Sequence, residues 1–191
     1  MIRVQNRLSV KVHLQHEVCG RHVCERRRKR RRADEEKSMA KDEYERPSVT
    51  ADCVVLKKDG AEGLVSVLLI QRAKEPFAGR WALPGGFVNK DEPLLEAARR
   101  ELQEETGLRV ERLRQVGAFG DPGRDPRGWT ISVAYVAELA DGAHHIEAAD
   151  DARSVGWFPV DSPPPLAFDH DKILAHALAA VSDPRSSKSS E

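Results

Sequence analysis

Apolar and polar residues follow one another along residues 48–181 in a pattern that predicts several strands and two helices. The apolar stretches 49–56 and 64–71 flank a polar turn at 57–63, a combination that predicts a β-hairpin. Further β-rich stretches, bounded by Pro and Gly residues, predict strands at 108–119, 129–139 and 153–160.

Two segments carry the signals of helices. Asp91 is expected to cap a helix that takes Pro93 in its first turn, runs through 94–105 and ends at Gly107. A second helix is expected at about 169–181. Strands combined with two helices predict an α+β fold or an αβα sandwich.

The length of 191 residues predicts one domain with a buried core. The continuously apolar runs, such as 67–70, are far shorter than the ~20 residues that a membrane-spanning helix needs, and the first residues show no secretory signal. Three cysteines are too few for a disulfide scaffold. We therefore expect a soluble, cytoplasmic protein without a membrane partner.

The net charge of zero results from two regions of opposite sign. Residues 1–38 carry 12 Lys and Arg against 5 Asp and Glu, whereas residues 39–191 carry 19 against 26. The uninterrupted basic run 26–32 predicts a solvated stretch, because like charges at that density repel one another and bury nothing. We expect residues 1–46 to be a basic, disordered N-terminal extension, 47–182 to be the folded domain, and 183–191 to be a disordered tail.

The basic extension has three other interpretations. A run of basic residues is typical of nucleic-acid contacts or nuclear localisation, so nucleic acid is a candidate partner through this segment alone. Met39 directly precedes the patterned domain and is an alternative functional start of the protein. Side chains of the types that bind zinc also gather here, although their spacing matches no common zinc pattern: His16, Cys19, His22 and Cys24.

Three glutamates near the end of the first expected helix carry the most informative chemistry. Glu101, Glu104 and Glu105 are three and four residues apart, so their carboxylates lie on one side of the helix within about one turn. Such like-charged pairs destabilise a helix by about 0.2–0.5 kcal/mol each, and the negative end of the helix dipole disfavours them further. A hard divalent cation would reverse that penalty. The alternative is an ordinary solvated acidic face.

These glutamates belong to a longer motif. Residues 86–108, GFVNKDEPLLEAARRELQEETGL, resemble the Nudix box, Gly-x5-Glu-x7-Arg-Glu-U-x-Glu-Glu-x-Gly-U with U aliphatic, at every defined position. The preceding residues 79–86, GRWALPGG, are similar to the family's lead-in to the box. The resemblance extends over about 48–181 and implies the Nudix αβα sandwich with a mixed β-sheet.

The resemblance implies hydrolysis of a nucleoside diphosphate linked to another moiety, with Mg2+ or Mn2+ as the cofactor. It implies that Glu101 and Glu105 are metal ligands and that Glu104 shares or supports a second ion. Arg100, four residues before Glu104, is placed to hold these carboxylates through hydrogen bonds.

The glycines and the general base complete the expected site. Gly85 and Gly86 allow the backbone to approach metal or phosphate closely, where a side chain would block it, and the Gly85 carbonyl is a further candidate ligand. Glu101 is our first candidate for the general base, with Asp151 and Glu147 of a downstream loop as alternatives, since sequence does not show which group reaches the attacking water.

Residues outside the box bear on the substrate. Residues 119–128, FGDPGRDPRG, and 166–170, LAFDH, look like those of the ADP-ribose pyrophosphatase branch, and equally like the Nudix domain of transcriptional regulators that bind ADP-ribose-type ligands. Arg124 and Arg127 are candidates for contacts to phosphate or ribose, or for loop salt bridges to the neighbouring aspartates Asp121 and Asp125.

We therefore predict a hydrolase that cleaves a nucleotide sugar, ADP-ribose, to AMP and ribose 5-phosphate. Arg72 and Trp81 are candidates for contacts on the nucleotide side, with a core or lid role as the alternative for Trp81. The alternatives for the whole protein are a pyrophosphatase of oxidised nucleoside triphosphates and a non-catalytic sensor of ADP-ribose-type ligands. The resemblance also implies a homodimer.

Overall fold

The structure is a computed structural model that describes residues 45–59, 64–140, 144–148 and 152–183. The chain divides into two compact units, Met1–Arg46 and Pro47–Glu191, and the description below concerns the second. The basic run at 26–32, the cysteine and histidine cluster at 16–24 and Asp151 lie outside the described residues. Within the described ranges, no helix is both long enough and apolar enough to cross a membrane.

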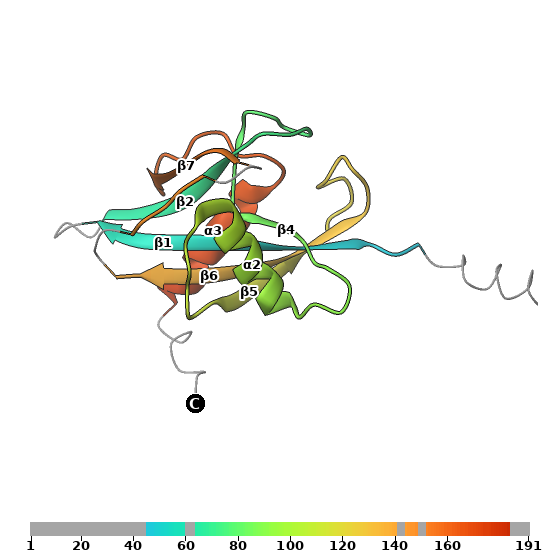
Figure 1. Cartoon of the computed structure of the whole chain (residues 1–191), viewed down its shortest axis with the longest axis horizontal. Helices are drawn as coiled ribbons and strands as arrows, with labels where there is room; N and C mark the ends of the chain where they lie inside the picture. Colours follow the sequence, from blue (N-terminus) through green and yellow to red (C-terminus); the bar gives the residue numbers. More distant parts are fainter. Residues whose placement is uncertain (1–44, 60–63, 141–143, 149–151, 184–191) are drawn as a thin grey trace, which may run out of the picture. The chain divides into compact units, whose positions relative to one another are not determined.

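The second unit is built on one mixed sheet. Its strands lie in the order β3-β2-β1-β6-β5, with β4 paired to β1 and β7 paired to β2. The strands β1 and β6 run parallel, and the other pairs are antiparallel. Along the chain (Figure 1) the elements are β1 (Ser48–Asp59), β2 (Leu64–Arg72), β3 (Trp81–Ala82), β4 (Gly85–Phe87), α2 (Leu94–Thr106), β5 (Arg114–Phe119), β6 (Thr130–Leu139), β7 (Ala152–Pro159) and α3 (His170–Ser182).

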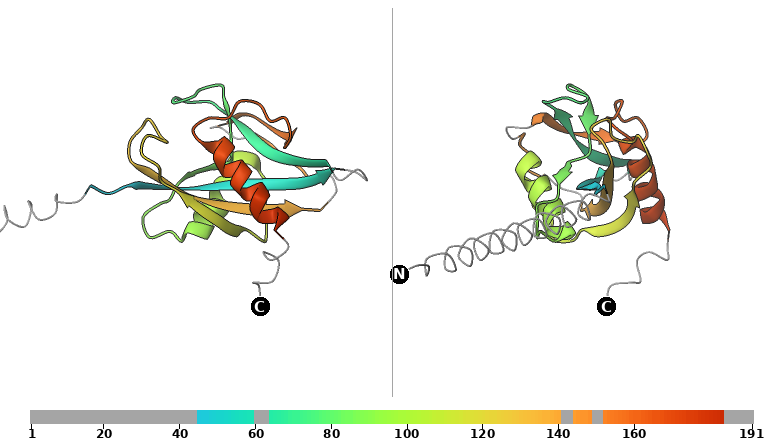
Figure 2. Two further views of the ribbon diagram at one scale, coloured as in Figure 1. Left: turned by 180° about the vertical axis from the view of Figure 1, so that it is seen from behind. Right: turned by 90° about the vertical axis from the view of Figure 1, so that its right-hand side faces the viewer.

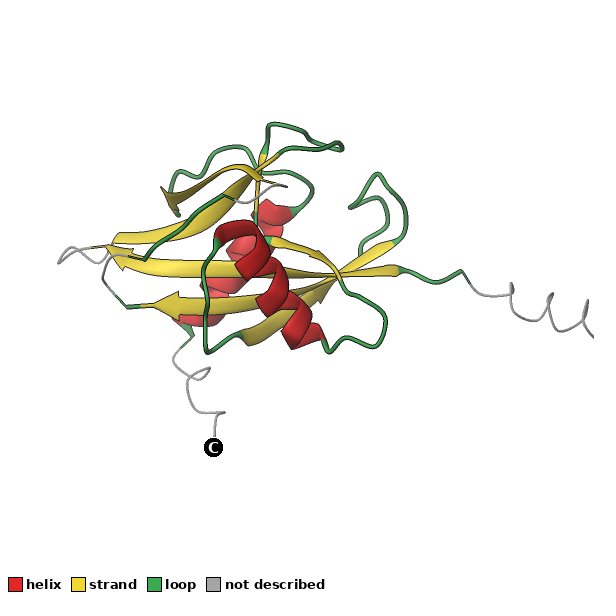
Figure 3. Ribbon diagram, in the orientation of Figure 1, coloured by secondary structure: helices red, strands yellow, loops and turns green. Residues whose placement is uncertain are grey.

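The two helices cover opposite faces of the sheet. Figure 3 shows α2 crossing one face, and the view from behind in Figure 2 shows α3 on the other. Cys53 and Val55 of β1 pack with the buried face of α2, whereas Val54 and Leu56 pack with that of α3. Because successive side chains of a strand point to opposite faces, one continuously apolar strand supplies both layers of the core. The expected αβα sandwich is confirmed.

The element boundaries differ from the sequence prediction at three places. Asp91 does not cap α2: its backbone is left-handed, at φ 64°, and the N-cap is Pro93, which makes no side-chain capping bond. The strand expected at 108–119 begins only at Arg114, because the apolar residues before it pack against the core from a loop. The short strands β3 and β4 were not predicted, since two or three residues are too few to show a period.

Candidate active site

The C-terminal half of α2 carries the predicted carboxylates beside its buried face. The helix packs against β1 and β4 through Ala97, Ala98, Leu102 and Thr106, which are all buried. It ends because Gly107 adopts a left-handed conformation, at φ 70°, and donates its N–H to the carbonyl of Gln103. The helix therefore presents Glu101 and Glu105 toward the β4 backbone.

Glu105 is the more enclosed of the two carboxylates. The backbone N–H of Gly85 donates to Glu105 Oε2 at 2.8 Å. Burial, followed by the nearby charges of Glu101 and Asp52, raises the pKa of Glu105 to about 8. A buried carboxylate that carries this penalty would gain from a cation placed beside it.

Glu101 lies against the second glycine of β4. A Cβ added to Gly86 would stand 2.6 Å from the carboxylate of Glu101, closer than any real contact of that kind. Burial raises the pKa of Glu101, and its ion pair with Arg100 opposes that effect. A side chain at this position would therefore displace the Glu101 carboxylate from its place beside the strand.

Arg100 connects the box residues. Its guanidinium donates to both oxygens of Glu92, at 2.7 and 2.9 Å, and to Glu101 at 2.7 Å. It also reaches the exposed carboxylate of Glu104 at 3.2 Å and the Phe87 carbonyl at 3.1 Å. The hydrogen bonds from Arg100 lower the pKa of Glu92 to about 2. Glu92 therefore anchors Arg100, and Arg100 in turn orients Glu101.

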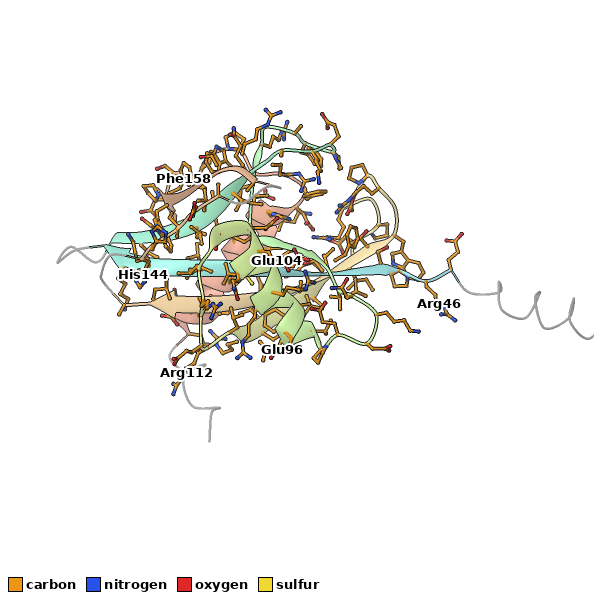
Figure 4. All side chains as sticks on the ribbon, in the orientation of Figure 1. Arg46, Glu96, Glu104, Arg112, His144 and Phe158 are labelled. Carbon is orange, nitrogen blue, oxygen red and sulfur yellow. The ribbon has the colours of Figure 1, made fainter. Side chains whose placement is uncertain are left out.

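Glu104 is separated from the other two glutamates by its exposure. Its side chain is 61% exposed, whereas that of Glu101 is 15% exposed. Figure 4 labels Glu104 together with Glu96 of the same helix. Glu96 is also exposed and forms an ion pair with Arg99 at 2.7 Å. Of the three predicted carboxylates, Glu101 and Glu105 thus share the enclosed position.

A cleft opens beside these carboxylates. Its outer part has a volume of about 320 Å³ and is lined by Glu101, Glu105, Arg72, Asn89 and the β4 backbone, among others. A smaller pocket of about 50 Å³ adjoins it. The two share Ile70, Arg72, Gly85, Gly86 and Phe87. Both candidate glycines and the candidate Arg72 therefore line the same cleft as the carboxylates.

Arg72 has no carboxylate partner among the described residues. Its guanidinium donates to the Pro76 carbonyl at 2.8 Å and to the Lys74 carbonyl at 3.4 Å, and it lies 4.9 Å from the centre of the Phe168 ring. Burial, and then the charge of Arg127, lowers the pKa of Arg72. A half-buried guanidinium with this environment can accept an anionic ligand.

The two loop arginines are both engaged in ion pairs. Arg124 is almost fully buried and makes a two-pronged contact with Asp169, at 2.6 and 3.0 Å, rather than with Asp121. Arg127 pairs with Asp125 at 2.7 Å, as the salt-bridge alternative predicted. The Arg127 guanidinium also lies between the rings of Phe87 and Phe168, at 4.8 and 5.1 Å from their centres.

Two predicted residues lie away from the described cleft. Trp81 packs in the core beneath α3, edge-on to Phe158 at 4.5 Å between ring centres, which is the core alternative. Glu147 is 79% exposed and lies 3.7 Å from His145, while its backbone N–H donates to the Thr106 carbonyl. Neither residue lines the two pockets described above.

The sequence prediction missed two buried polar residues at the inner pocket. Asp52 of β1 accepts a hydrogen bond from Ser132 of β6. His170, the first residue of α3, accepts the backbone N–H of Leu83 at Nδ1, at 2.9 Å. An aspartate inside an apolar strand is a signal that could have drawn attention to Asp52, because a buried charge needs a partner. His170 ends the stretch 166–170 that resembles the ADP-ribose pyrophosphatase branch, but no role was predicted for it.

A mixed sheet between two helices, with a glutamate-bearing helix against a Gly-Gly strand, defines the class of this protein. A family model described as the NUDIX domain matches residues 46–177, so the chain belongs to the NUDIX family. Among curated relatives, the chain is 40% identical over 131 residues to the ADP-ribose pyrophosphatase of Methanocaldococcus jannaschii, a match that covers 69% of this chain and 73% of that protein.

A second relative and two solved structures extend the comparison. The ADPR responsive transcriptional repressor NtrR of Acinetobacter baylyi is 36% identical over 75% of this chain, which spans only 58% of the repressor. The NUDIX domain of Shewanella oneidensis NrtR, complexed with ADP ribose, is 31% identical with a TM-score of 0.66, covering 73% of this chain and 91% of that one. A bifunctional NMN adenylyltransferase/ADP ribose pyrophosphatase from Francisella tularensis, complexed with AMP and a manganese ion, is 29% identical with a TM-score of 0.62, covering 77% and 45%.

Proposed function

We propose that the protein hydrolyses the pyrophosphate of ADP-ribose to give AMP and ribose 5-phosphate, with Mg2+ or Mn2+ as its metal. The observation that carries the proposal is that the carboxylates of Glu101 and Glu105 and the guanidinium of Arg72 line one cleft. Carboxylates suit a hard cation, and an arginine without a carboxylate partner suits a phosphate. The similarity to an ADP-ribose pyrophosphatase supports this substrate.

The chemistry of the carboxylates fits a divalent cation. Among the described residues no three side chains converge into a complete metal cage. Mg2+ does not need one, because it usually keeps several waters and takes one or two carboxylates together with substrate phosphates. Glu101 and Glu105 would hold the ion, and the exposed Glu104 would support a second. When bound, the ion would neutralise charge on the pyrophosphate and lower the pKa of a water.

The residues of the chain would bind the substrate and take up the proton of the attacking water. The oxygen of a water attacks one phosphorus, and the bridging oxygen leaves with the other phosphate. Glu101 is our candidate to take the proton from that water, and Arg100, 2.7 Å away, holds its carboxylate in place. Arg72 would bind the phosphate charge from the side of β2. Glu147 and Asp151 remain the alternative bases.

The carboxylates and the comparisons bear on the alternative functions. The complete carboxylate set, with Arg100 in place, favours an enzyme over a sensor that only binds. The similarity to the repressor keeps the sensor as the second candidate.

The test is turnover by the purified full-length chain with Mg2+ or Mn2+. ADP-ribose is expected to be the best substrate among ADP-ribose, NADH, sugar nucleotides, dinucleoside polyphosphates and 8-oxo-dGTP. Glu101→Gln and Glu105→Gln should each lower kcat by about 10²–10⁴-fold. Glu96→Gln, on the same helix but exposed, is the matched control and should leave kcat unchanged. Tight ADP-ribose binding without turnover of any substrate would establish the sensor instead.

The partner predictions are tested separately. Sedimentation of the full-length chain would reveal the expected homodimer. Nucleic-acid binding through the basic extension should weaken steeply with salt and disappear when residues 1–38 are deleted.

A further inference from the structure

The inner pocket contains a buried donor and a buried acceptor that the proposed hydrolysis does not use. It adjoins the main cleft at Gly85 and Gly86, and its volume is about 50 Å³. His170 and Asp52 line it, and each residue is only 5% exposed. Buried polar groups are costly unless they are hydrogen-bonded, so each one is expected to have a partner in the protein or in a bound ligand.

His170 presents an N–H donor. The backbone N–H of Leu83 donates to Nδ1 at 2.9 Å, so Nδ1 carries no proton and the proton of the neutral ring is on Nε2. Burial lowers the pKa of His170, which keeps the ring neutral at physiological pH. The ring makes no other hydrogen bond within the described part of the chain, and no buried side-chain nitrogen there lacks a partner, so Nε2 has accessible surface.

Asp52 presents the matching acceptor. Ser132 donates its hydroxyl proton to one carboxylate oxygen, Oδ2. The other oxygen, Oδ1, lies against Gly85, where a Cβ would clash with it. The charge of Asp52 contributes to the pKa shifts of both His170 and Glu105, so the aspartate is close enough to influence both groups.

The size and charge of the pocket restrict what can fill it. The inner pocket, at about 50 Å³ against about 320 Å³ for the outer part of the cleft, suits a small polar group of a larger ligand that lies in the cleft. The rings of Phe87 and Phe168, with the Arg127 guanidinium between them, form one wall. Of the three arginines that line the pocket, Arg124 and Arg127 are already paired with Asp169 and Asp125, so a phosphate there would have only Arg72 to attract it and would lie beside the carboxylate of Asp52. A hydroxyl can donate to Asp52 and accept from His170 at the same time.

We propose that Asp52 and His170 form a hydroxyl-recognition subsite that takes a ribose hydroxyl of the substrate. The proposal rests on the ADP-ribose-type ligand of the proposed function. The hydroxyl comes from the distal ribose or from the ribose of the adenosine, and both present the same chemistry. A site built to hydrogen-bond a hydroxyl discriminates strongly against analogues that lack it, because the buried donor and acceptor are then left without partners.

The experiment measures equilibrium binding, so that it does not depend on turnover. Full-length chain carrying Glu101→Gln is titrated by calorimetry, with Mg2+ present, with three ligands: ADP-ribose, the methyl ester of ADP, and ADP-ribose without the adenosine 2′- and 3′-hydroxyls. Asp52→Asn and His170→Asn are added singly to this background. Asparagine at 170 retains an acceptor for the Leu83 N–H and removes the Nε2 donor, and melting temperatures check that each variant is folded.

Each variant is expected to weaken ADP-ribose binding by about 10- to 100-fold. The ligand that lacks the contacted sugar hydroxyl should bind the parent protein and both variants with dissociation constants within about threefold of one another. If that ligand is the methyl ester of ADP, the hydroxyl belongs to the distal ribose. If it is ADP-ribose without the adenosine hydroxyls, the hydroxyl belongs to the ribose of the adenosine. Equal weakening of all three ligands, or no weakening of ADP-ribose, would overturn the subsite. Absence of ADP-ribose hydrolysis by the wild type would instead overturn the proposed function, whatever the binding result.

Discussion

Replacing Glu105 by Gln tests how much the buried negative charge of Glu105 lowers the free energy of unfolding when no metal is bound. The Gly85 N–H donates to Glu105 Oε2 at 2.8 Å, and the carbonyl oxygen of a glutamine can accept the same bond. Gln and Glu have nearly the same size and shape. The substitution therefore removes the charge while the surrounding contacts are retained.

The magnitude follows from the pKa. Burial, and then Glu101 and Asp52, raises the pKa of Glu105 from its ordinary value of 4.5 to about 8. A group whose pKa is raised by folding contributes stability below its unfolded pKa, and that contribution is lost as the pH rises through the folded pKa. The wild type should therefore lose stability between about pH 4.5 and pH 8, by on the order of 5 kcal/mol at most.

Urea denaturation in EDTA, followed by circular dichroism, measures this effect. At pH 9 the Glu105→Gln variant should be more stable than the wild type by about 2–5 kcal/mol, and at pH 5 by much less. Saturating Mg2+ should reverse the order at pH 9, because only the ionised carboxylate gains from the cation. Glu96→Gln, whose side chain is 54% exposed, is the control and should show no such pH dependence. A stabilisation equal at pH 5 and pH 9, or none at pH 9, would refute the reasoning.

Three further predictions concern Arg100, the Arg124–Asp169 ion pair and Gly86. Arg100→Lys keeps the charge but cannot span Glu92 and Glu101 as the planar guanidinium does, so kcat should fall about 10- to 100-fold, while Arg99→Lys on the exposed face should change nothing. Arg124→Ala leaves Asp169 buried without its partner and should lower the free energy of unfolding by about 3–5 kcal/mol in urea. Asp169→Asn added to the Arg124→Ala variant should recover part of the lost free energy of unfolding, and a further decrease in that free energy would contradict the ion-pair explanation. Gly86→Ala places a Cβ 2.6 Å from the Glu101 carboxylate and should lower kcat more than tenfold with the circular dichroism spectrum unchanged; wild-type kcat would mean that Glu101 is free to move.

The layers of the fold could be predicted because they depend on local periods. The run from Cys53 to Leu56 is apolar at every position, which is typical of a strand buried on both faces, and the structure places α2 and α3 on those two faces. The glutamates of α2 were predictable for the same reason, since three- and four-residue spacing places them on one side of a helix. The boundaries were less predictable, because Asp91 and residues 108–113 serve loops whose course depends on the core beneath them.

The sequence by itself determined the sandwich, the helix with its carboxylates and the family, because each of these is written in contiguous residues with a fixed period or spacing. Only the tertiary structure decided which polar and charged groups share an environment. Asp52, Arg124 and His170 lie far apart along the chain, and hydrophobic periodicity carries no signal for the pairing of a polar side chain with a partner 80 or 45 residues away. Burial then assigns their roles, because a charge removed from water must find a partner in space, and sequence order does not define that partner.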